Sequence, residues 1–433
     1  YVVLYDGAGT LTYSGGGSLD AASSTPGRDV VVADGHSPVI VNITATTAGN
    51  YVRNIRFLMP GGVCSTDAFR YCDDASPCDT GSCSTFETNY ATQIFHPTFL
   101  SRVRGYRTLR FMDWMATNNS SVSAQGPKVT DARWRGHGVP VEILLELANR
   151  IGADAWLNVP HLATDAYVTS LATAVHDRLA PGLKAYIEYS NEVWNGIFSQ
   201  GTYCEQQGVA LGLGSSPFEA RLRFQAQRSV EIFEIFETIF PGAERQRLVR
   251  VLASQAANSW VSTTLLDHGA ALQHTDALAI APYFGGYLGG SDHLAAVSAM
   301  DLDDLFAELG TVAVPTSLSW VTMQAAVASQ RNVSLIAYEA GNHLAGIQGV
   351  ENNTAVNALF DAANRDPRMR QLYTSYLDGW KANGGELLVH FVNCDAPSKW
   401  GRWGALEYLE QPRSEAPKYD AVQTFIETNP AWW

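Results

Sequence analysis

Residues 154–190 read DAWLNVPHLATDAYVTSLATAVHDRLAPGLKAYIEYS, and the order of segments within this stretch indicates the fold. Its two ends, 154–160 and 183–190, are almost continuously apolar, which is typical of strands buried on both faces of a parallel sheet. The segment between them carries an apolar side chain at every fourth position, namely Tyr167, Leu171, Val175 and Leu179. That spacing predicts an amphipathic helix, and the whole stretch therefore predicts a β–α–β unit.

The same alternation extends outward in both directions from about residue 51. Eight apolar runs occur: VRNIRFLM (52–59), RTLRFMDW (107–114), DAWLNVP (154–160), LKAYIEYS (183–190), RLVRVLAS (247–254), DALAIAPY (276–283), VSLIAYEA (333–340) and GELLVHFVN (385–393). Eight β–α alternations predict a closed (β/α)₈ TIM barrel over residues 51–433. An open doubly wound sheet is the alternative, but no glycine-rich phosphate loop follows the first run.

Residues 1–50 have a different pattern. VVLYD, TLTYS, DVVVAD and PVIVNITA are short alternating runs separated by Gly, Ser and Pro-Gly turns. They predict a β-rich accessory segment, 1–50, packed on the barrel. A carbohydrate-binding module is the alternative, although about 50 residues is short for one.

Composition narrows the range of partners. Of the 433 residues, 46% are hydrophobic and 17% charged, so the chain can build a large core, and the net charge of −14 disfavours nucleic acid as a ligand. No run approaches the roughly 20 apolar residues of a membrane helix. The 11 Trp and 18 Tyr suit neutral sugars, whose C–H faces pack on aromatic rings, although most of these residues are expected in the core.

Cysteines and sequons favour export. Four of six cysteines crowd one polar loop, and we expect two disulfides among Cys64, Cys72, Cys78 and Cys83. A zinc site is the rival, but the loop lacks paired C-x₂₋₄-C spacing. The other two, Cys204 and Cys394, either pair or stay reduced. Five N-x-S/T sequons occur, at Asn42, Asn118, Asn119, Asn332 and Asn352. We therefore expect a secreted chain whose signal segment has been removed.

Two glutamates end predicted strands. Glu192 follows the fourth apolar run in YSNEVWN, and Glu339 closes the seventh in IAYEAGNH. The carboxyl ends of barrel strands converge on one mouth, where catalysis occurs. A carboxylate at the end of an apolar strand is costly unless it is solvated, paired or functional. One such glutamate could simply be half of a structural salt bridge. Two of them, on the fourth and seventh predicted strands, predict a catalytic pair.

These motifs resemble the clan A retaining β-glycosidases, which include cellulases, mannanases and xylanases. An Asn-Glu pair ends the fourth strand in that clan, with Glu as acid/base, and a second Glu ends the seventh as nucleophile. The resemblance, which covers about residues 51–430, implies Asn191-Glu192 and Glu339 for these positions. The SNEVWN phrase also resembles a group of secreted bacterial and eukaryotic proteins.

The resemblance implies further site residues. Arg110, on the second strand, is expected to hold Glu339 ionised through a bidentate contact. Tyr283, at the end of the sixth strand, is expected to hydrogen-bond the nucleophile, and Asn191 to bind the sugar 2-hydroxyl. The clan's Trp platform under the reactive sugar matches either Trp400 or Trp403, which flank Gly401-Arg402 after the eighth strand.

Other candidates come from position alone. His161 ends the third strand and is expected either to reach a sugar hydroxyl or to be a core histidine. Trp194 lies just past Glu192 and is a candidate for substrate binding. Asp113 and Trp114 follow the second strand, and Asn342 and His343 follow Glu339.

Two other function classes are possible. A metal-dependent barrel hydrolase would use His161, His343 and His390, but the chain has no H-E-x-x-H motif or early His-x-His pair. A binding-only barrel would keep the cleft without turnover. A serine hydrolase is disfavoured because no G-x-S-x-G elbow occurs. The resemblance to clan A implies hydrolysis of a β-linked glycan, with a β-1,4-glycan favoured by the clan's usual substrates, and we expect neither a metal nor a cofactor.

Overall fold

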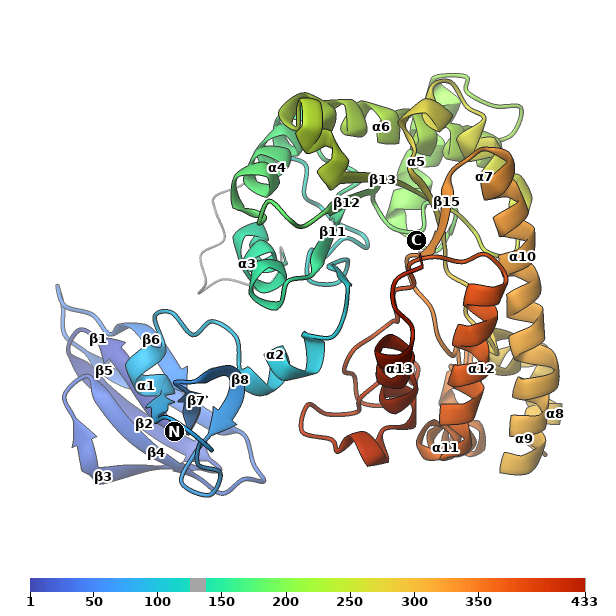
Figure 1. Ribbon diagram of the computed structural model, residues 1–433. Coiled ribbons are helices and arrows are strands. Elements are labelled where there is room, and N and C mark those ends of the chain that lie inside the picture. Colours follow the sequence, from blue (N-terminus) through green and yellow to red (C-terminus); the bar gives the residue numbers. More distant parts are fainter. Residues whose placement is uncertain (125–137, 433) are drawn as a thin grey trace. The chain divides into compact units, whose positions relative to one another are not determined.

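The protein, studied as a computed structural model, is described for residues 1–124 and 138–432. It divides into two compact units, Tyr1–Val103 and Arg104–Trp433. Figure 1 shows the elements of both units.

The N-terminal unit contains the expected β-rich segment. A four-stranded sheet has the order β3-β4-β1-β6, and β2 pairs with β5. The strands are β1 (Val2–Asp6), β2 (Gly9–Gly15), β3 (Gly17–Thr25), β4 (Arg28–Ala33), β5 (Val39–Thr46) and β6 (Arg53–Leu58). Their alternating apolar residues, with Val3, Leu11 and Val31 at the centre, form one small core. One buried and one solvated face explains the period of two in the sequence.

The prediction that residues 52–59 form the first barrel strand is wrong. This segment forms β6, which pairs antiparallel with β1 through Val3 and Phe57. None of its residues is buried, and Arg53 and Arg56 interrupt its apolar character. A parallel barrel strand is buried on both faces, which such a segment cannot be. The division between units consequently lies at 103/104 rather than at 50/51.

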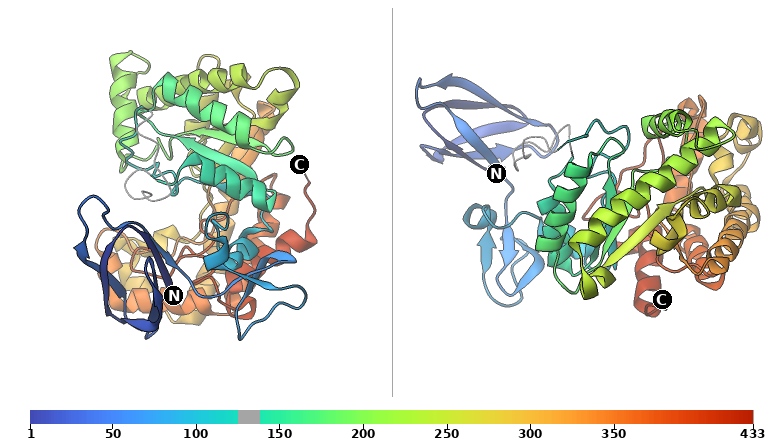
Figure 2. Two further views of the ribbon diagram at one scale, coloured as in Figure 1. Left: turned by 90° about the vertical axis from the view of Figure 1, so that its left-hand side faces the viewer. Right: turned by 90° about the horizontal axis from the view of Figure 1, so that it is seen from above.

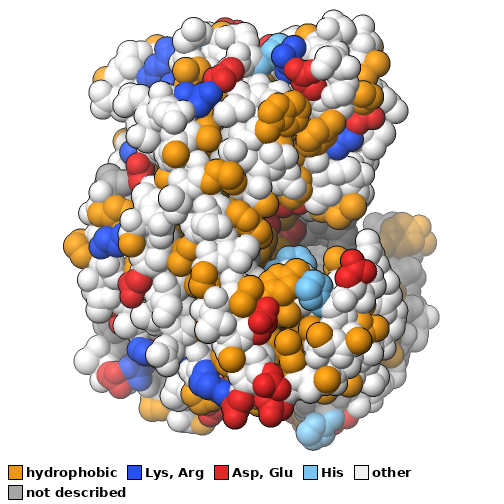
Figure 3. Space-filling model, turned by 90° about the vertical axis from the view of Figure 1, so that its right-hand side faces the viewer, with side chains coloured by type: hydrophobic (Ala, Val, Ile, Leu, Met, Phe, Trp, Pro, Cys, Tyr) orange, Lys and Arg blue, Asp and Glu red, His pale blue; other side chains and the backbone are white. Residues whose placement is uncertain are grey.

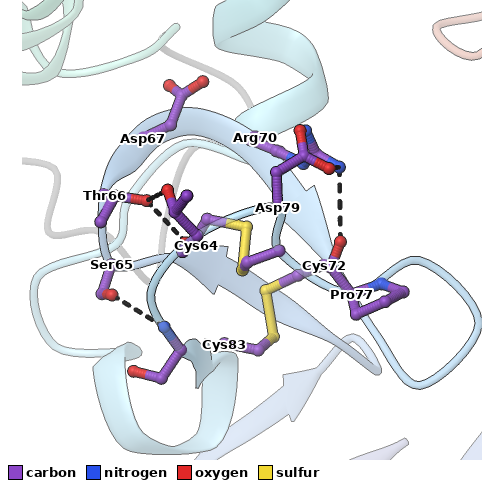
Figure 4. The surroundings of a disulfide bond; sticks show 12 residues. Cys64, Ser65, Thr66, Asp67, Arg70, Cys72, Pro77, Asp79 and Cys83 are labelled. Atoms are coloured by element: carbon purple, nitrogen blue, oxygen red, sulfur yellow. Dashed lines mark hydrogen bonds and ion pairs between the residues drawn. A yellow bond between two sulfur atoms is a disulfide. The ribbon is translucent and has the colours of Figure 1, made fainter.

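A disulfide-linked three-stranded sheet completes the N-terminal unit. It consists of β7 (Gly62–Cys64), β8 (Asp67–Cys72) and β9 (Cys83–Thr85), followed by the helices α1 (Phe86–Asn89) and α2 (Pro97–Val103). The two expected disulfides are present as Cys64–Cys78 and Cys72–Cys83, with Cα–Cα distances of 5.6 and 5.8 Å (Figure 4). Cys204 and Cys394 form no disulfide within the described chain.

The C-terminal unit is built on a parallel sheet of six strands in chain order, β10 to β15. They are β10 (Thr108–Arg110), β11 (Asp154–Val159), β12 (Ala185–Tyr189), β13 (Leu248–Ala253), β14 (Ala277–Ile280) and β15 (Ser334–Ala337). These correspond to the second through seventh predicted runs. The eighth run joins through a parallel bridge from Leu388 to Ala337. The parallel β/α order expected from the sequence is therefore confirmed for these seven runs.

The sheet curls so that its inner faces meet. Inward-facing residues of β11 through β15 and of the eighth run belong to one buried cluster, which includes Trp156, Tyr186, Val251, Ala279, Ile336, Tyr338 and Leu387. The Trp156 and Tyr186 rings stack with centroids 5.4 Å apart. Arg110, at the end of the first strand, contacts Glu339, just past the sixth, at 2.8 Å, whereas in an open doubly wound sheet these two strands would be too far apart to touch. The TIM-barrel class is thus the correct one, with a half-barrel of six strands among the described residues.

Helices lie outside this curled sheet (Figures 1 and 2). They are α3 (Val141–Ile151), α4 (Asp165–Arg178), α5 (Ser199–Ala210), α6 (Pro217–Ile239), α7 (Ser259–Leu266), α8 (Leu294–Val297), α9 (Leu302–Glu308), α10 (Val314–Gln330), α11 (Thr354–Arg365), α12 (Arg368–Ala382) and α13 (Pro417–Thr428). The side chains of Thr164 and Ser216 cap the first turns of α4 and α6. Among the described helices, none has both the length and the apolar character that crossing a membrane requires.

Candidate active site

The carboxyl ends of the parallel strands place charged residues at one edge of the sheet. Glu192 lies three residues beyond the end of β12, and Glu339 lies two residues beyond the end of β15. Arg110 is the last residue of β10. On the face shown in Figure 3, acidic and histidine side chains lie in a hollow with hydrophobic side chains around it.

Arg110 links the residues of this site. Its Nη1 donates to Glu339 Oε1 at 2.8 Å, and its Nη2 donates to Asn191 Oδ1 at 2.8 Å. Its Nε and Nη2 form a two-point contact with Glu188, at 2.9 and 3.0 Å. The Arg110 side chain is only 3% exposed. A buried cation needs partners of opposite charge or hydrogen-bond acceptors, and these contacts supply them. The sequence predicted the contact with Glu339, but the bidentate partner is Glu188.

Glu188 was missed by the sequence reasoning. It lies inside β12, where its carboxylate also accepts a hydrogen bond from Trp156 Nε1 at 2.8 Å. A charged residue in the middle of the otherwise apolar run LKAYIEYS was the available signal, because such a residue requires a buried partner of opposite charge.

Glu339 lies between a cation and an aromatic cluster. Tyr283 donates its hydroxyl to Glu339 Oε2 at 2.9 Å, and Glu339 is only 7% exposed. The Tyr283 ring meets Trp403 edge-on, with centroids 5.6 Å apart, and Trp403 meets His343 at 4.9 Å. The three rings thus form an aromatic cluster beside the carboxylate.

Glu192 accepts hydrogen bonds from two neutral donors. Tyr338 donates its hydroxyl to Oε1 at 3.0 Å, and Asn195 donates its amide to Oε2 at 2.9 Å. Glu192 has φ of 42° and Ser190 has φ of 60°, both in the left-handed region that residues other than glycine seldom adopt. Backbone strain of this kind persists where the surroundings impose it, and it clusters at functional sites.

Burial and neighbouring charges shift the pKa values of both carboxyls. Burial raises the pKa of Glu192, and the hydrogen bonds from Asn195 and Tyr338 oppose this rise. Burial likewise raises the pKa of Glu339, Arg110 lowers it, and repulsion from Glu192 raises it further. Because the guanidinium touches Glu339 directly, it favours the ionised form of this carboxyl and opposes the rise in its pKa.

Asn191 lies in a network of amide side chains. Its Nδ2 donates to Asn118 Oδ1 at 3.0 Å, and Gln200 Nε2 donates both to that oxygen, at 2.8 Å, and to the main-chain oxygen of Asn191, at 2.9 Å. With Oδ1 held by Arg110, Asn191 is oriented from both sides. One Nδ2 proton remains for a sugar hydroxyl.

The other predicted residues are spread more widely. His161 is buried, and its ring lies edge-on to that of Tyr203 on α5, with centroids 5.4 Å apart. These surroundings match the core role expected as one alternative for this residue. Burial also lowers the pKa of His161. Trp194 is half-buried, and its main-chain oxygen accepts a hydrogen bond from Arg221 at 3.4 Å. Trp403 belongs to the aromatic cluster, whereas Trp400 is 64% exposed.

The histidines proposed for a metal site have aromatic or polar neighbours instead. His343 packs against Trp403, and His390 Nε2 lies 3.2 Å from the Tyr373 hydroxyl. Among the described residues, the one cluster with metal-ligand spacing consists of Cys64, Cys72 and Cys78, whose sulfurs are in disulfides.

Comparison with known proteins found similarity in structure only. No family model matches the chain. No curated protein matches it either. A Bacteroidetes-affiliated GH5 cellulase is 10% identical, with a TM-score of 0.46 over 86% of this chain and 92% of that one. A Bacteroides salanitronis GH5-4 broad-specificity endoglucanase is 12% identical, with a TM-score of 0.39 over 86% and 94%.

A Cellulomonas fimi endo-β-1,4-mannanase double mutant is 13% identical, with a TM-score of 0.38 over 66% of this chain and 57% of that one. This chain therefore spans little more than half the length of that mannanase. The solved structures similar to this chain thus include GH5 and GH26 glycoside hydrolases of clan A, the clan that its motifs resemble.

Proposed function

We propose that this chain is a secreted, retaining glycoside hydrolase that cleaves β-linked glycans, with Glu339 as nucleophile and Glu192 as acid/base. One observation carries the proposal. Two carboxyls at the mouth of a parallel β/α sheet, one buried and one half-buried, have different surroundings, since Glu339 contacts a cation and Glu192 contacts neutral donors. Environments that separate the charge states of two carboxyls are what acid–base division of labour requires.

In the first step, an ionised Glu339 oxygen bonds to the anomeric carbon. The bond from that carbon to the leaving sugar oxygen breaks, and Glu192 gives its proton to this oxygen. The Arg110 and Tyr283 contacts favour the ionised form of the attacking carboxylate and orient it. Asn191, held by Arg110, offers its remaining amide proton to the sugar.

In the second step, Glu192 acts as a base. It takes a proton from water, the water oxygen attacks the anomeric carbon, and the bond to Glu339 breaks. Two inversions at this carbon give net retention, provided that the carboxyls lie about 5–5.5 Å apart.

The surroundings of the pair favour a neutral sugar. Trp403, Tyr283 and His343 present aromatic faces and edges beside Glu339, and such rings pack against the C–H faces of pyranoses. A β-1,4-glycan is the substrate we favour. The two disulfides support an extracellular location.

The test is hydrolysis of cellulose, xylan, mannan and β-1,3-glucan oligosaccharides, followed by mass spectrometry and early-time NMR of the new anomeric proton. We expect the β-anomer to form first, with rates unchanged by a chelator. An α-anomer first product would overturn the retaining mechanism. Chelator-sensitive turnover would favour the metal-dependent alternative, and binding without turnover would favour a non-catalytic barrel.

A further inference from the structure

We propose that Tyr338 is a positioning residue whose hydroxyl sets the protonation of Glu192, making it a stronger acid. This inference rests on the proposed function, in which Glu192 exchanges a proton in each step. It assigns a role to the residue that immediately precedes the nucleophile.

The placement of Tyr338 links the two carboxyls. Its side chain is fully buried within the curled sheet, and its hydroxyl donates to Glu192 Oε1 at 3.0 Å. The Arg110 guanidinium lies over its ring, 5.0 Å from the centroid. Neighbouring residues 338 and 339 therefore serve different partners, one donating to the acid/base and the other providing the nucleophile. The ring, held by the cluster and by Arg110, fixes where the hydroxyl lies.

The two donors to Glu192 differ in what they can do. Asn195 is oriented by its own Oδ1, which accepts from the Ile197 main-chain N–H at 3.2 Å, so its amide can only donate to Glu192. The Tyr338 hydroxyl can rotate and either donate or accept. In the structure it donates to Glu192. A hydrogen bond donated to an ionised carboxylate is stronger than one exchanged with the neutral carboxyl, so this hydroxyl favours the ionised state of Glu192.

The charges around Glu192 make the Tyr338 hydroxyl important for stabilising the ionised form of this carboxyl. The titratable and charged groups that act on or face Glu192 are Arg110, Glu188, Glu339, Tyr283 and Tyr338. Arg110 is already shared by Glu188 and Glu339, so its favourable effect on a third carboxylate is reduced. Burial and the nearby carboxylates raise the pKa of Tyr338 well above its usual value, so its hydroxyl stays protonated.

The experiment compares pH profiles of kcat/KM for wild type and Tyr338→Phe, using a substrate with a poor leaving group. The variant keeps the ring over Arg110 and removes only the hydroxyl. Loss of a donor to the ionised form raises the pKa of Glu192, so the alkaline limb should move up by about one pH unit. The weaker acid should also lower the plateau rate about tenfold.

Tyr376→Phe is the matched control. Tyr376 is equally buried, but its hydroxyl donates to the main-chain oxygen of Pro282 at 2.8 Å, so this variant also loses one buried hydrogen bond. A purely structural role for Tyr338 predicts similar melting temperatures for the two variants and an unmoved alkaline limb in both. That result would overturn the proposal.

A second measurement does not need turnover. Titration of ¹³C-labelled Glu192, assigned by comparison with Glu192→Gln, should show the same upward shift in Tyr338→Phe. An unchanged titration overturns the proposal even if glycans are hydrolysed. An upward shift in a protein that hydrolyses no glycan supports the control of Glu192 by Tyr338 and overturns only the proposed glycosidase activity.

Discussion

Arg110 contacts Glu188 through two nitrogens and Glu339 through a third, so one buried cation is shared by two carboxylates. The contact with Glu188 fixes the plane of the guanidinium, and that plane directs Nη1 at Glu339. Glu188 thus orients a charge that acts on another residue. Removing the cation should affect folding and chemistry together.

Arg110→Met should lower the free energy of unfolding by about 3–5 kcal/mol, because two buried carboxylates lose their cation. Arg110 lowers the pKa of Glu339, so its loss should also move the acid limb of the pH–rate profile upward. Urea unfolding and a pH profile measure these effects. Arg331→Met is the control, because the more exposed pair of Arg331 with Asp267 contributes at most about 1 kcal/mol. Equal destabilisation by both substitutions would contradict the central role of Arg110.

Glu339→Ala should reduce hydrolysis of every substrate roughly a thousandfold or more, because no covalent intermediate can form. Azide should restore a weak reaction that yields the glycosyl azide of inverted configuration. Anomer-resolved NMR of the product measures this. Full activity in the variant would refute the assignment of the nucleophile.

Glu192→Ala should slow the second step more than the first when the substrate is an activated aryl glycoside. Such a leaving group needs little protonation, whereas attack by water still needs a base. Stopped-flow detection of the aryl product should then show a burst followed by a slow steady state. Equal slowing of both steps would argue against an acid/base role.

Lys418 should make stability depend on pH. It is 1% exposed and donates to the Arg402 main-chain oxygen at 2.7 Å, and burial lowers its pKa to about 7. In the unfolded chain its pKa is about 10.4. Between these values the unfolded state binds the extra proton, so stability should rise with pH, by roughly 2–4 kcal/mol in total. Urea midpoints at intervals across this range should rise less in Lys418→Met; parallel dependences would contradict the prediction.

The sequence predicted most of the parallel sheet because buried strands have a clear apolar signature. In Asp154–Val159 every residue is buried, and the corresponding apolar run predicts a strand. The prediction for 52–59 is wrong because the length and apolar content of this run resemble those of a barrel strand. Its partner, β1, precedes it by about 50 residues, and pairing over that distance leaves no local signal.

The candidate site was predictable in part. Strand-end position identified Glu192 and Glu339, and the resemblance to clan A added Arg110 and Tyr283. The structure brings these four residues together. Tyr338 was overlooked because a buried tyrosine next to the candidate nucleophile resembles an ordinary core residue. The contacts of His161 depend on the direction in which its ring points, and neither the residue type nor its position in the sequence determines that direction.

The amide network behind Asn191 has a consequence for how this protein is produced. Asn118 lies in a glycosylation sequon, yet its Oδ1 accepts from both Asn191 and Gln200. N-glycosylation would join an oligosaccharide to Asn118 Nδ2, which lies 3.6 Å from Met112 Sδ in a part-buried position, so a glycan attached before folding would crowd the side chains beside this network. Production in a host that glycosylates nascent chains should therefore yield a fraction of molecules with a distorted candidate site, whereas a host without this machinery avoids the loss.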